Sequence, residues 1–262
     1  MDSYRIAIIG AGPAGLSAAA RAARLDAESG STAPTHILLE GFELPAKTIQ
    51  RYQKGKHVMA EPGFLDLRSD MSFAAGSREQ ILDKWQAELG ATGVNIRFGS
   101  EVTAITGARG NFSIALADGQ AIRAESIVLA IGLEGNPRKL GVAGENLPRV
   151  QYQLDDPEEF SDETIVVVGA GDAAIENALA LSAQNEVWIL NRRDEFSRAK
   201  EGNLNAILAA ISNPEHRLHC RYSTSASDVR EGADGELPLV MTLDTPEGEV
   251  TQPCHRVIAR LG

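Results

Sequence analysis

Two stretches of this sequence decide its fold: Gly10-Ala11-Gly12-Pro13-Ala14-Gly15 and Gly169-Ala170-Gly171-Asp172-Ala173-Ala174. Each follows a short apolar run, residues 4–9 and residues 164–168, and each precedes a segment of strong helix formers. A strand, a glycine-rich turn and a helix in this order form the dinucleotide-binding fingerprint. The first glycine permits the tight turn, the second lets a pyrophosphate approach the backbone, and a small third residue lets the helix pack on the strand.

Because the fingerprint occurs twice, we predict an α/β protein with two Rossmann-like dinucleotide-binding domains, each a parallel sheet with helices plus a small antiparallel β meander. Each helix N-terminus offers unpaired N–H groups and the positive end of the helix dipole to phosphates. Pro13 suits a first helical turn, where its missing N–H has no cost. A glycine-rich turn without a ligand is the alternative, which the strand–turn–helix context disfavours.

The residue that ends the next strand distinguishes between nucleotides. After the first fingerprint, the apolar run 36–39 ends at Glu40, whose carboxylate would accept hydrogen bonds from a ribose 2′-hydroxyl and repel a 2′-phosphate. This favours FAD or NAD in the first domain. After the second fingerprint, the run 186–190 is followed by three arginines: Arg192, Arg193 and Arg198. Because guanidinium groups pair bidentately with phosphate, the second domain is predicted to prefer NADPH.

The chain resembles the low-molecular-weight thioredoxin reductases and their relatives within the two-dinucleotide-domain flavoproteins, which share the FAD/NAD(P)-binding fold. The matching residues are 10–15 with Glu40, 127–132, Gly144-Glu145, 169–174 with Glu176, and Asn191-Arg192-Arg193-Asp194-Glu195-Phe196. The resemblance implies FAD and NADPH as cofactors. It implies that FAD is held by Gly10, Gly12, Pro13, Ala14, Gly15, Glu40, Val102, Ala130 and Gly132. With the second fingerprint, the residues expected to hold NADPH are Gly169, Gly171, Asp172, Ala173, Ala174, Arg192, Arg193 and Arg198.

The sequence departs from that family in its cysteines. Thioredoxin reductases of this type carry a Cys-x-x-Cys pair, but this chain has only Cys220 and Cys254, and residues 150–163 contain no cysteine. It is therefore more similar to the branch without the dithiol, the bacillithiol-disulfide-reductase-like proteins and the thioredoxin-reductase-like ferredoxin–NADP reductases. We expect an FAD-dependent NADPH oxidoreductase whose flavin passes electrons directly to an unidentified acceptor, a small molecule or a redox protein.

The predicted organisation is an FAD-binding domain over residues 1–140, an acidic, Pro-containing linker over 141–160 and an NADPH-binding domain over 161–262. In relatives, a C-terminal segment returns to the first domain and completes the FAD site, and this sequence stops at about the strand that leads into it. A helix is predicted over 78–89, with Ser77 as its N-cap. Short strands are predicted over 94–98, 101–105, 111–117, 121–124 and 127–131.

A locally basic segment, residues 47–59, follows the position expected for the FAD ribose. We expect Lys47 to contact the FAD, and Lys54, Lys56 and His57 to receive an anionic acceptor. His57 is also the one candidate for proton transfer, because an unperturbed imidazole titrates near pH ~6.5. A solvated basic loop is the alternative. The remaining histidines are expected to be structural, and no metal site is predicted.

Composition narrows the class of protein. The chain has 262 residues and a net charge of −11, and this negative charge makes nucleic acid an unexpected partner. No apolar run approaches the ~20 residues that a membrane span needs. Two cysteines without a spacing pattern and an N-terminus that enters a strand directly favour a cytoplasmic protein; a homodimer is left open. Two other functions stay open: an FAD/NADP(H)-binding sensory or regulatory module without turnover, and, ranked lower, a flavin monooxygenase.

Overall fold

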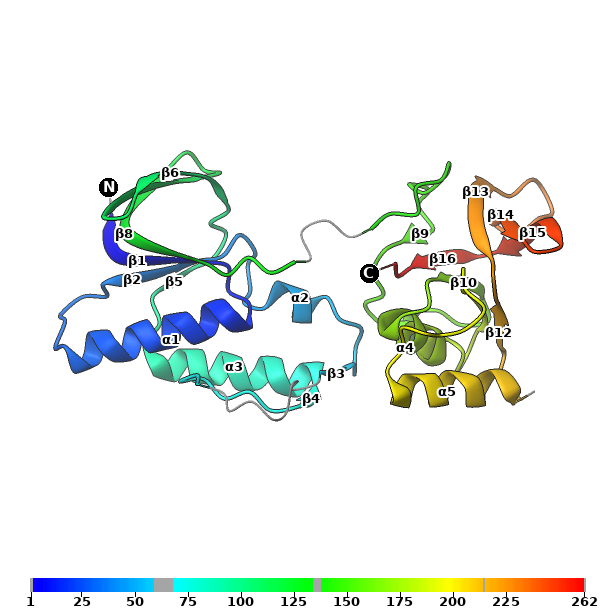
Figure 1. Ribbon diagram of the computed structural model, residues 1–262, viewed down its shortest axis with the longest axis horizontal. Helices are drawn as coiled ribbons and strands as arrows, with labels where there is room; N and C mark the ends of the chain where they lie inside the picture. The colour runs from blue at the N-terminus through cyan, green and yellow to red at the C-terminus, as the bar shows by residue number, and fades with distance from the viewer. Residues whose placement is uncertain (1, 59–67, 134–137, 214, 262) are drawn as a thin grey trace. The chain divides into compact units, whose positions relative to one another are not determined.

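The computed structural model describes residues 2–58, 68–133, 138–213 and 215–261. The chain forms two compact units, Met1–Gly135 and Asn136–Gly262 (Figure 1). Each unit contains a sheet with parallel strands and helices packed against it, as the two fingerprints predict. Among the helices of the described residues, none has the length and apolarity that crossing a membrane requires.

The first unit is built on one six-stranded sheet in the order β5-β2-β1-β8-β7-β6. Its strands are β1 (Ser3–Ile9), β2 (His36–Leu39), β5 (Ile96–Arg97), β6 (Val102–Ala108), β7 (Asn111–Leu116) and β8 (Ala121–Leu129). The strands β5, β2, β1 and β8 are parallel, whereas β6, β7 and β8 form an antiparallel meander. The first unit thus has the predicted combination of a parallel sheet and a meander.

Helices and strands of the first unit bury the two faces of this sheet. The helices are α1 (Pro13–Glu28), α2 (Lys47–Gln50) and α3 (Arg78–Thr92), and β3 (His57–Val58) pairs with β4 (Gly76–Ser77). Ile8 and Leu38 pack with Trp85 of α3 on the helical side, where α1 and α3 lie side by side (Figure 1). Alternate residues of the same strands, Ala7 and Ile37, pack against the meander on the other side. This alternation follows from the two-residue period of a strand.

Local sequence explains the best predicted helix, α3. The Ser77 hydroxyl accepts a hydrogen bond from the backbone N–H of Gln80, and the Gln80 side chain accepts one from the backbone N–H of Ser77, which completes a capping box. The helix ends at Gly93, which has a φ of +67°. The prediction of a helix from residue 78 is confirmed. The strands expected over 121–124 and 127–131 form one strand, β8, because its pairing passes from β7 to β1 without a break.

The second unit has a five-stranded, wholly parallel sheet in the order β12-β11-β10-β16-β9. Its strands are β9 (Val150–Gln151), β10 (Thr164–Val168), β11 (Glu186–Leu190), β12 (Leu218–Arg221) and β16 (Arg256–Ala259). The helices α4 (Asp172–Leu181) and α5 (Glu201–Ser212) bury one face, and η1 (Pro157–Glu159) is a short 3-10 helix. A three-stranded antiparallel sheet buries the other face of the parallel sheet. Its strands are β13 (Ser225–Glu231), β14 (Leu239–Thr245) and β15 (Gly248–Cys254).

The segment 141–160, expected to be a linker, packs within the second unit. Val150 and Gln151 form β9, which extends the parallel sheet beside β16. Leu154 is 3% exposed in the core formed with α4 and α5, and Leu147 packs against the core beneath the three-stranded sheet. The first unit ends at Gly135 and the second begins at Asn136.

Candidate functional site

The first fingerprint lies directly against the end of β8. Gly10 has a φ of +98°, and a Cβ added to it would lie 2.6 Å from the carbonyl oxygen of Ala130. A Cβ on Gly15 would lie 1.8 Å from the carbonyl oxygen of Gly10 and 3.3 Å from the Ala130 Cβ. Since these neighbours are mostly backbone atoms, which cannot rotate away, both positions require glycine. The structure therefore brings Gly10, Gly15 and Ala130 together at the carboxyl edge of the sheet.

The second glycine of this fingerprint faces open space. No atom lies within 4 Å of a Cβ added to Gly12, which is the N-cap of α1 and has no side chain to bind the first N–H groups. Pro13 occupies the first turn, followed by Ala14. The first N–H groups of a helix have no partner within it and attract anions. These residues fit a pyrophosphate, which could approach the backbone where any side chain would obstruct it.

Glu40 joins the first fingerprint to the turn after β2. Its Oε2 accepts a hydrogen bond from the Ala11 N–H (2.7 Å), and its Oε1 accepts one from the Phe42 N–H (2.9 Å). The residue is 9% exposed. Because a carboxylate oxygen can accept more than one hydrogen bond, this geometry leaves acceptor capacity for a ribose hydroxyl. It also gives Glu40 a role that the sequence analysis missed, which is to hold the glycine-rich loop in place.

The other residues expected around FAD lie at or near the same edge. Lys47 begins α2 and is exposed, with its Nζ 5.7 Å from the centre of the Phe42 ring. The preceding residue, Ala46, donates its N–H to the Ala11 carbonyl (2.8 Å), which places α2 beside the fingerprint. Val102 is half-buried at the start of β6, and Gly132 follows β8 with a φ of +68°. His57 is exposed in β3, opposite Ser77.

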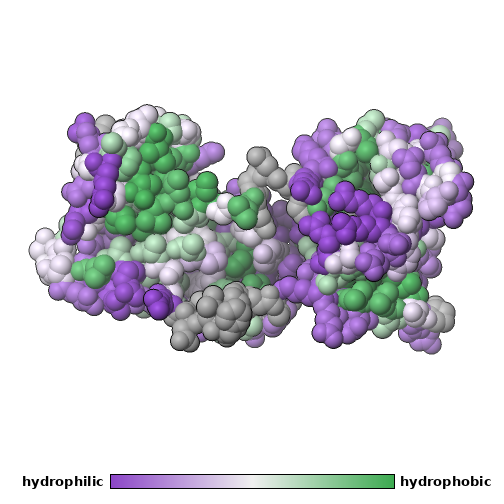
Figure 2. Space-filling model, viewed as in Figure 1, coloured by the Kyte–Doolittle hydropathy of each residue, from purple (hydrophilic) through white to green (hydrophobic). Residues whose placement is uncertain are grey.

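Apolar side chains flank Ala130. Leu129, the last residue of the central strand β8, is 63% exposed, and Ile131, two residues beyond it, is 69% exposed. Figure 2 shows hydrophobic residues gathered on this unit over β6–β8. An apolar surface beside a phosphate-binding loop suits a ligand that has an aromatic ring system at one end, as FAD does.

The second fingerprint repeats the first with one difference. Gly169 has a φ of +133°, and a Cβ added to it would lie 2.2 Å from the carbonyl oxygen of Arg260. Gly171, the N-cap of α4, faces open space as Gly12 does. The third position is Ala174, which is fully buried, so this helix tolerates one methyl group against its strand. These residues fit a second pyrophosphate.

Asp172 begins α4, where its negative charge would oppose a phosphate. Its Oδ1 accepts hydrogen bonds from the Lys200 N–H (2.9 Å) and from Asn203 Nδ2 (2.8 Å), so its carboxylate is engaged by the first turn of α5. Ala173 follows in the first turn of α4. Asp172 therefore fixes α5 against the fingerprint, which is a positioning role that its place in the motif did not reveal.

The three arginines expected at the 2′-phosphate lie in the loop that follows β11. All three are exposed, and Arg193 donates from Nη1 to Ser197 Oγ (2.8 Å), next to Arg198 in the chain. The loop is organised by Asn191, which is 1% exposed. Asn191 Oδ1 accepts from the Arg193 N–H (3.0 Å), and its Nδ2 donates to the Glu195 carbonyl (2.9 Å). A buried amide thus holds exposed guanidinium groups at the end of β11.

The two cysteines are not arranged for redox chemistry. Both are free thiols, Cys220 on β12 and Cys254 on β15. Burial raises the pKa of each thiol to about 12. The thiolate is the reactive form, so neither cysteine is suited to relay electrons. Groups of His, Cys, Asp and Glu that could hold a metal ion are absent from the described residues.

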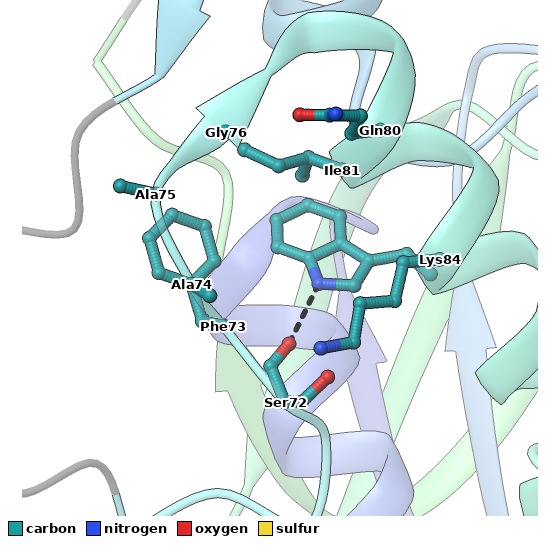
Figure 3. Close-up of a pocket in the computed structure, with 9 residues that line it drawn as sticks. Ser72, Phe73, Ala74, Ala75, Gly76, Gln80, Ile81 and Lys84 are labelled. Carbon is teal, nitrogen blue, oxygen red and sulfur yellow. Dashed lines mark hydrogen bonds between the residues drawn. The ribbon is translucent and has the colours of Figure 1, made fainter.

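A small cavity in the first unit lies between α3 and the segment before it (Figure 3). Its volume is about 80 Å³, and Phe73, Ile81 and Trp85 are among its walls. Trp85 Nε1 donates to the Ser72 carbonyl (3.0 Å), as the dashed line shows. Ligand pockets typically have volumes of about 300–1,000 Å³. This cavity is therefore too small for a nucleotide, and none of the expected site residues lines it.

Residues 7–262 match the family model for pyridine nucleotide-disulphide oxidoreductases, and the chain belongs to that family. It is 28% identical over 244 residues to a ferredoxin–NADP reductase of Lactiplantibacillus plantarum, covering 91% of this chain and 66% of that protein. It is 27% identical over 193 residues to a ferredoxin–NADP reductase of Ignicoccus hospitalis, covering 72% and 56%. The chain thus spans less than two thirds of the length of these relatives. Its family supports FAD and NADPH as the two cofactors.

Solved structures share the fold. Bacillithiol disulfide reductase Bdr from Staphylococcus aureus superposes with a TM-score of 0.84 at 21% identity, over 100% of this chain and 77% of that one. Thioredoxin reductase from Lactococcus lactis superposes with a TM-score of 0.76 at 22% identity, over 99% and 77%. The expected resemblance and the two-domain dinucleotide-binding fold are confirmed.

Proposed function

We propose that the chain binds FAD in its first unit and NADPH in its second, and that it acts as an NADPH-dependent flavin oxidoreductase. The observation that carries this proposal is the pair of fingerprints, in which backbone atoms exclude any side chain at Gly10 and Gly169 while Gly12 and Gly171 face open space. FAD, when bound, supplies the chemistry by accepting a hydride from NADPH and passing electrons to an acceptor.

The two sites differ in the charge at the end of the second strand. Glu40 follows β2, where its carboxylate accepts hydrogen bonds and excludes a 2′-phosphate from the FAD side. Arg192 and Arg193 follow β11, where their guanidinium groups attract one. This difference in charge assigns FAD to the first unit and NADPH to the second, and Arg198 is the third residue proposed for the 2′-phosphate.

The electron acceptor is proposed to react with the flavin directly, because Cys220 is half-buried, Cys254 is buried, and the pKa of both thiols is raised to about 12, which does not suit them to carry electrons. We propose a redox protein or a small molecule as the acceptor, since the relatives described above are named ferredoxin–NADP reductases. The basic segment that begins at Lys47 and includes His57 is proposed to receive it. A protein with an acidic surface fits that charge, and it would have to approach a chain of net charge −11 through this segment.

The test is the visible spectrum of the purified protein during anaerobic addition of NADPH. We expect a yellow protein whose flavin bleaches with NADPH and much less with NADH. A protein that binds FAD and NADPH without bleaching would instead be the binding module without turnover. A hydroperoxide-like spectrum on admission of oxygen would indicate a monooxygenase. A protein that cannot be reconstituted with FAD would contradict the assignment of the first unit.

A matched pair of variants checks the nucleotide preference. Arg192→Ala with Arg193→Ala is expected to slow bleaching by NADPH while leaving bleaching by NADH unchanged. Arg217→Gln is the control, because Arg217 is also exposed in the second unit but precedes β12, at the opposite edge of the sheet. Equal loss with both nucleotides would contradict a 2′-phosphate site.

A further inference from the structure

The strand order of the second unit places one more cation at the edge where the dinucleotide is expected. From β10 the chain proceeds to β11 and β12 on one side, whereas β16 lies on the other side of β10. The strand order therefore reverses between β10 and β16. In open parallel sheets, a dinucleotide crosses the carboxyl edge at such a switch point. The three arginines after β11 lie on one side of this point, and Arg260 follows β16 on the other.

Arg260 is in direct contact with the second fingerprint. Its N–H donates to the Val168 carbonyl (2.8 Å), at the end of β10. Its own carbonyl oxygen is the atom that would lie 2.2 Å from a Cβ on Gly169. The backbone of Arg260 is thus part of the wall against which the glycine-rich turn packs, and its side chain starts beside the phosphate-binding loop.

The guanidinium group of Arg260 has donors to spare. Its Nη1 donates to the Tyr152 carbonyl (2.9 Å), which anchors the side chain. Within the described part of the chain, its buried Nε has no hydrogen-bond partner. An arginine carries five N–H donors, and the residue is half-buried. The bond from Nη1 holds the guanidinium group in place, and the remaining Nη donors of this half-buried side chain are available to an anionic ligand.

We infer that Arg260 binds the pyrophosphate of the nicotinamide nucleotide, at the phosphate on the nicotinamide side. This inference rests on the proposed function and assigns a further binding residue to it. With the 2′-phosphate at the end of β11 and the first phosphate at the N-terminus of α4, the second phosphate continues toward β16, where Arg260 meets it. Arg260 therefore contributes to the affinity for NADP and for NAD alike, whereas Arg192 and Arg193 distinguish between them.

The test measures the binding of three nucleotides to the Arg260→Gln variant of the full chain by calorimetry. NADP⁺ and 2′-phospho-ADP-ribose both contain the second phosphate, and 2′,5′-ADP does not. We expect the affinity for the first two to fall on the order of 10- to 100-fold, as for the loss of a charge-assisted hydrogen bond. The affinity for 2′,5′-ADP is expected to stay within about twofold, since that ligand lacks the contact. Arg260→Lys should retain part of the affinity, and Arg217→Gln should retain all of it.

Several results would overturn the inference. One is wild-type affinity of Arg260→Gln for all three nucleotides. Another is an equal loss for all three with a lowered melting temperature, which would indicate a structural role. A loss for NADP⁺ but not for 2′-phospho-ADP-ribose would place the contact on the nicotinamide instead. If the wild-type chain binds none of the probes, this inference and the NADPH assignment both fail. If binding follows the expected pattern but NADPH does not bleach the flavin, only the proposed turnover fails.

Discussion

Replacing Gly15 with alanine inserts one methyl group where β1, α1 and β8 meet. The new Cβ would lie 1.8 Å from the Gly10 carbonyl oxygen, about half the separation of about 3.5–4.0 Å that non-bonded atoms prefer. Relief requires the helix or the glycine-rich turn to move, because the nearest atom belongs to the backbone. Alanine also favours a helix over glycine by about 1 kcal/mol, which offsets part of the cost. Overpacking costs about 1–3 kcal/mol, and a backbone contact belongs at the upper end, so we expect a net destabilisation of about 2 kcal/mol.

Gly90→Ala is the matched control for this substitution. Gly90 also lies in a helix, α3, but no atom lies within 4 Å of a Cβ added there. It gains the same helix propensity without the contact, and we expect it to stabilise the first unit by up to about 1 kcal/mol. The difference between the two variants therefore isolates the steric effect from the propensity.

The assay is urea unfolding of the first unit, followed by Trp85 fluorescence in a Trp188→Phe background. Trp85 is buried in the core of the first unit, and Trp188 lies in the second. With an m value of about 2 kcal/mol per M, Gly15→Ala should lower the midpoint by about 1 M, and Gly90→Ala should raise it slightly. A midpoint for Gly15→Ala equal to or above that of Gly90→Ala would refute the close packing of fingerprint and strand.

Three further outcomes follow from the sites. Gly12→Ala should leave the urea midpoint of the first unit unchanged, because the new Cβ meets open space in the protein. The variant should lose FAD on a desalting column, because the same Cβ would meet the pyrophosphate of the ligand. Full retention of FAD would contradict the proposed FAD site. Burial tends to raise the pKa of Asp26, but hydrogen bonds from Thr35 and His36 outweigh it and lower the pKa. The stability that this depressed pKa contributes is present above the unfolded value near ~3.9 and is lost as the pH falls through the folded value. Asp26→Asn should therefore be less stable than wild type at pH 7 by about 1–2 kcal/mol, and this difference in unfolding free energy should disappear below about pH 4. A difference that does not depend on pH would contradict the assignment to the Asp26 carboxylate. Since the pKa of both thiols is raised to about 12, Cys220 and Cys254 should react with iodoacetamide at pH 8 only in denaturant, and reaction of the folded protein would show that one of them is reactive.

Local sequence signals were sufficient for much of the fold. The strand over 164–168 and the helix from residue 78 were predicted at the residues where they occur, because apolar runs, glycine positions and an N-cap serine are short-range features. The pairing of β9 with β16 was missed, since two residues carry no pattern and their neighbours are distant in sequence.

The residues of the candidate sites likewise fall into those with a local sequence signal and those without one. Glycines, Glu40 and the arginines after β11 were visible because fixed spacing places them after strands. Arg260 was not, because the role proposed for it depends on which strand lies beside β10, which no local pattern states. Asn191 belonged to a recognised stretch, but its buried hydrogen bonds, and not its position, explain what it does.

The four apolar clusters each lie wholly on one side of the division at Gly135, two in each unit. Because each unit buries apolar clusters made of its own residues, we expect each unit to melt cooperatively with a calorimetric transition of its own. FAD is expected to raise the melting temperature of the unit that binds it, and NADP⁺ that of the other unit. The two shifts would therefore show which unit binds each nucleotide.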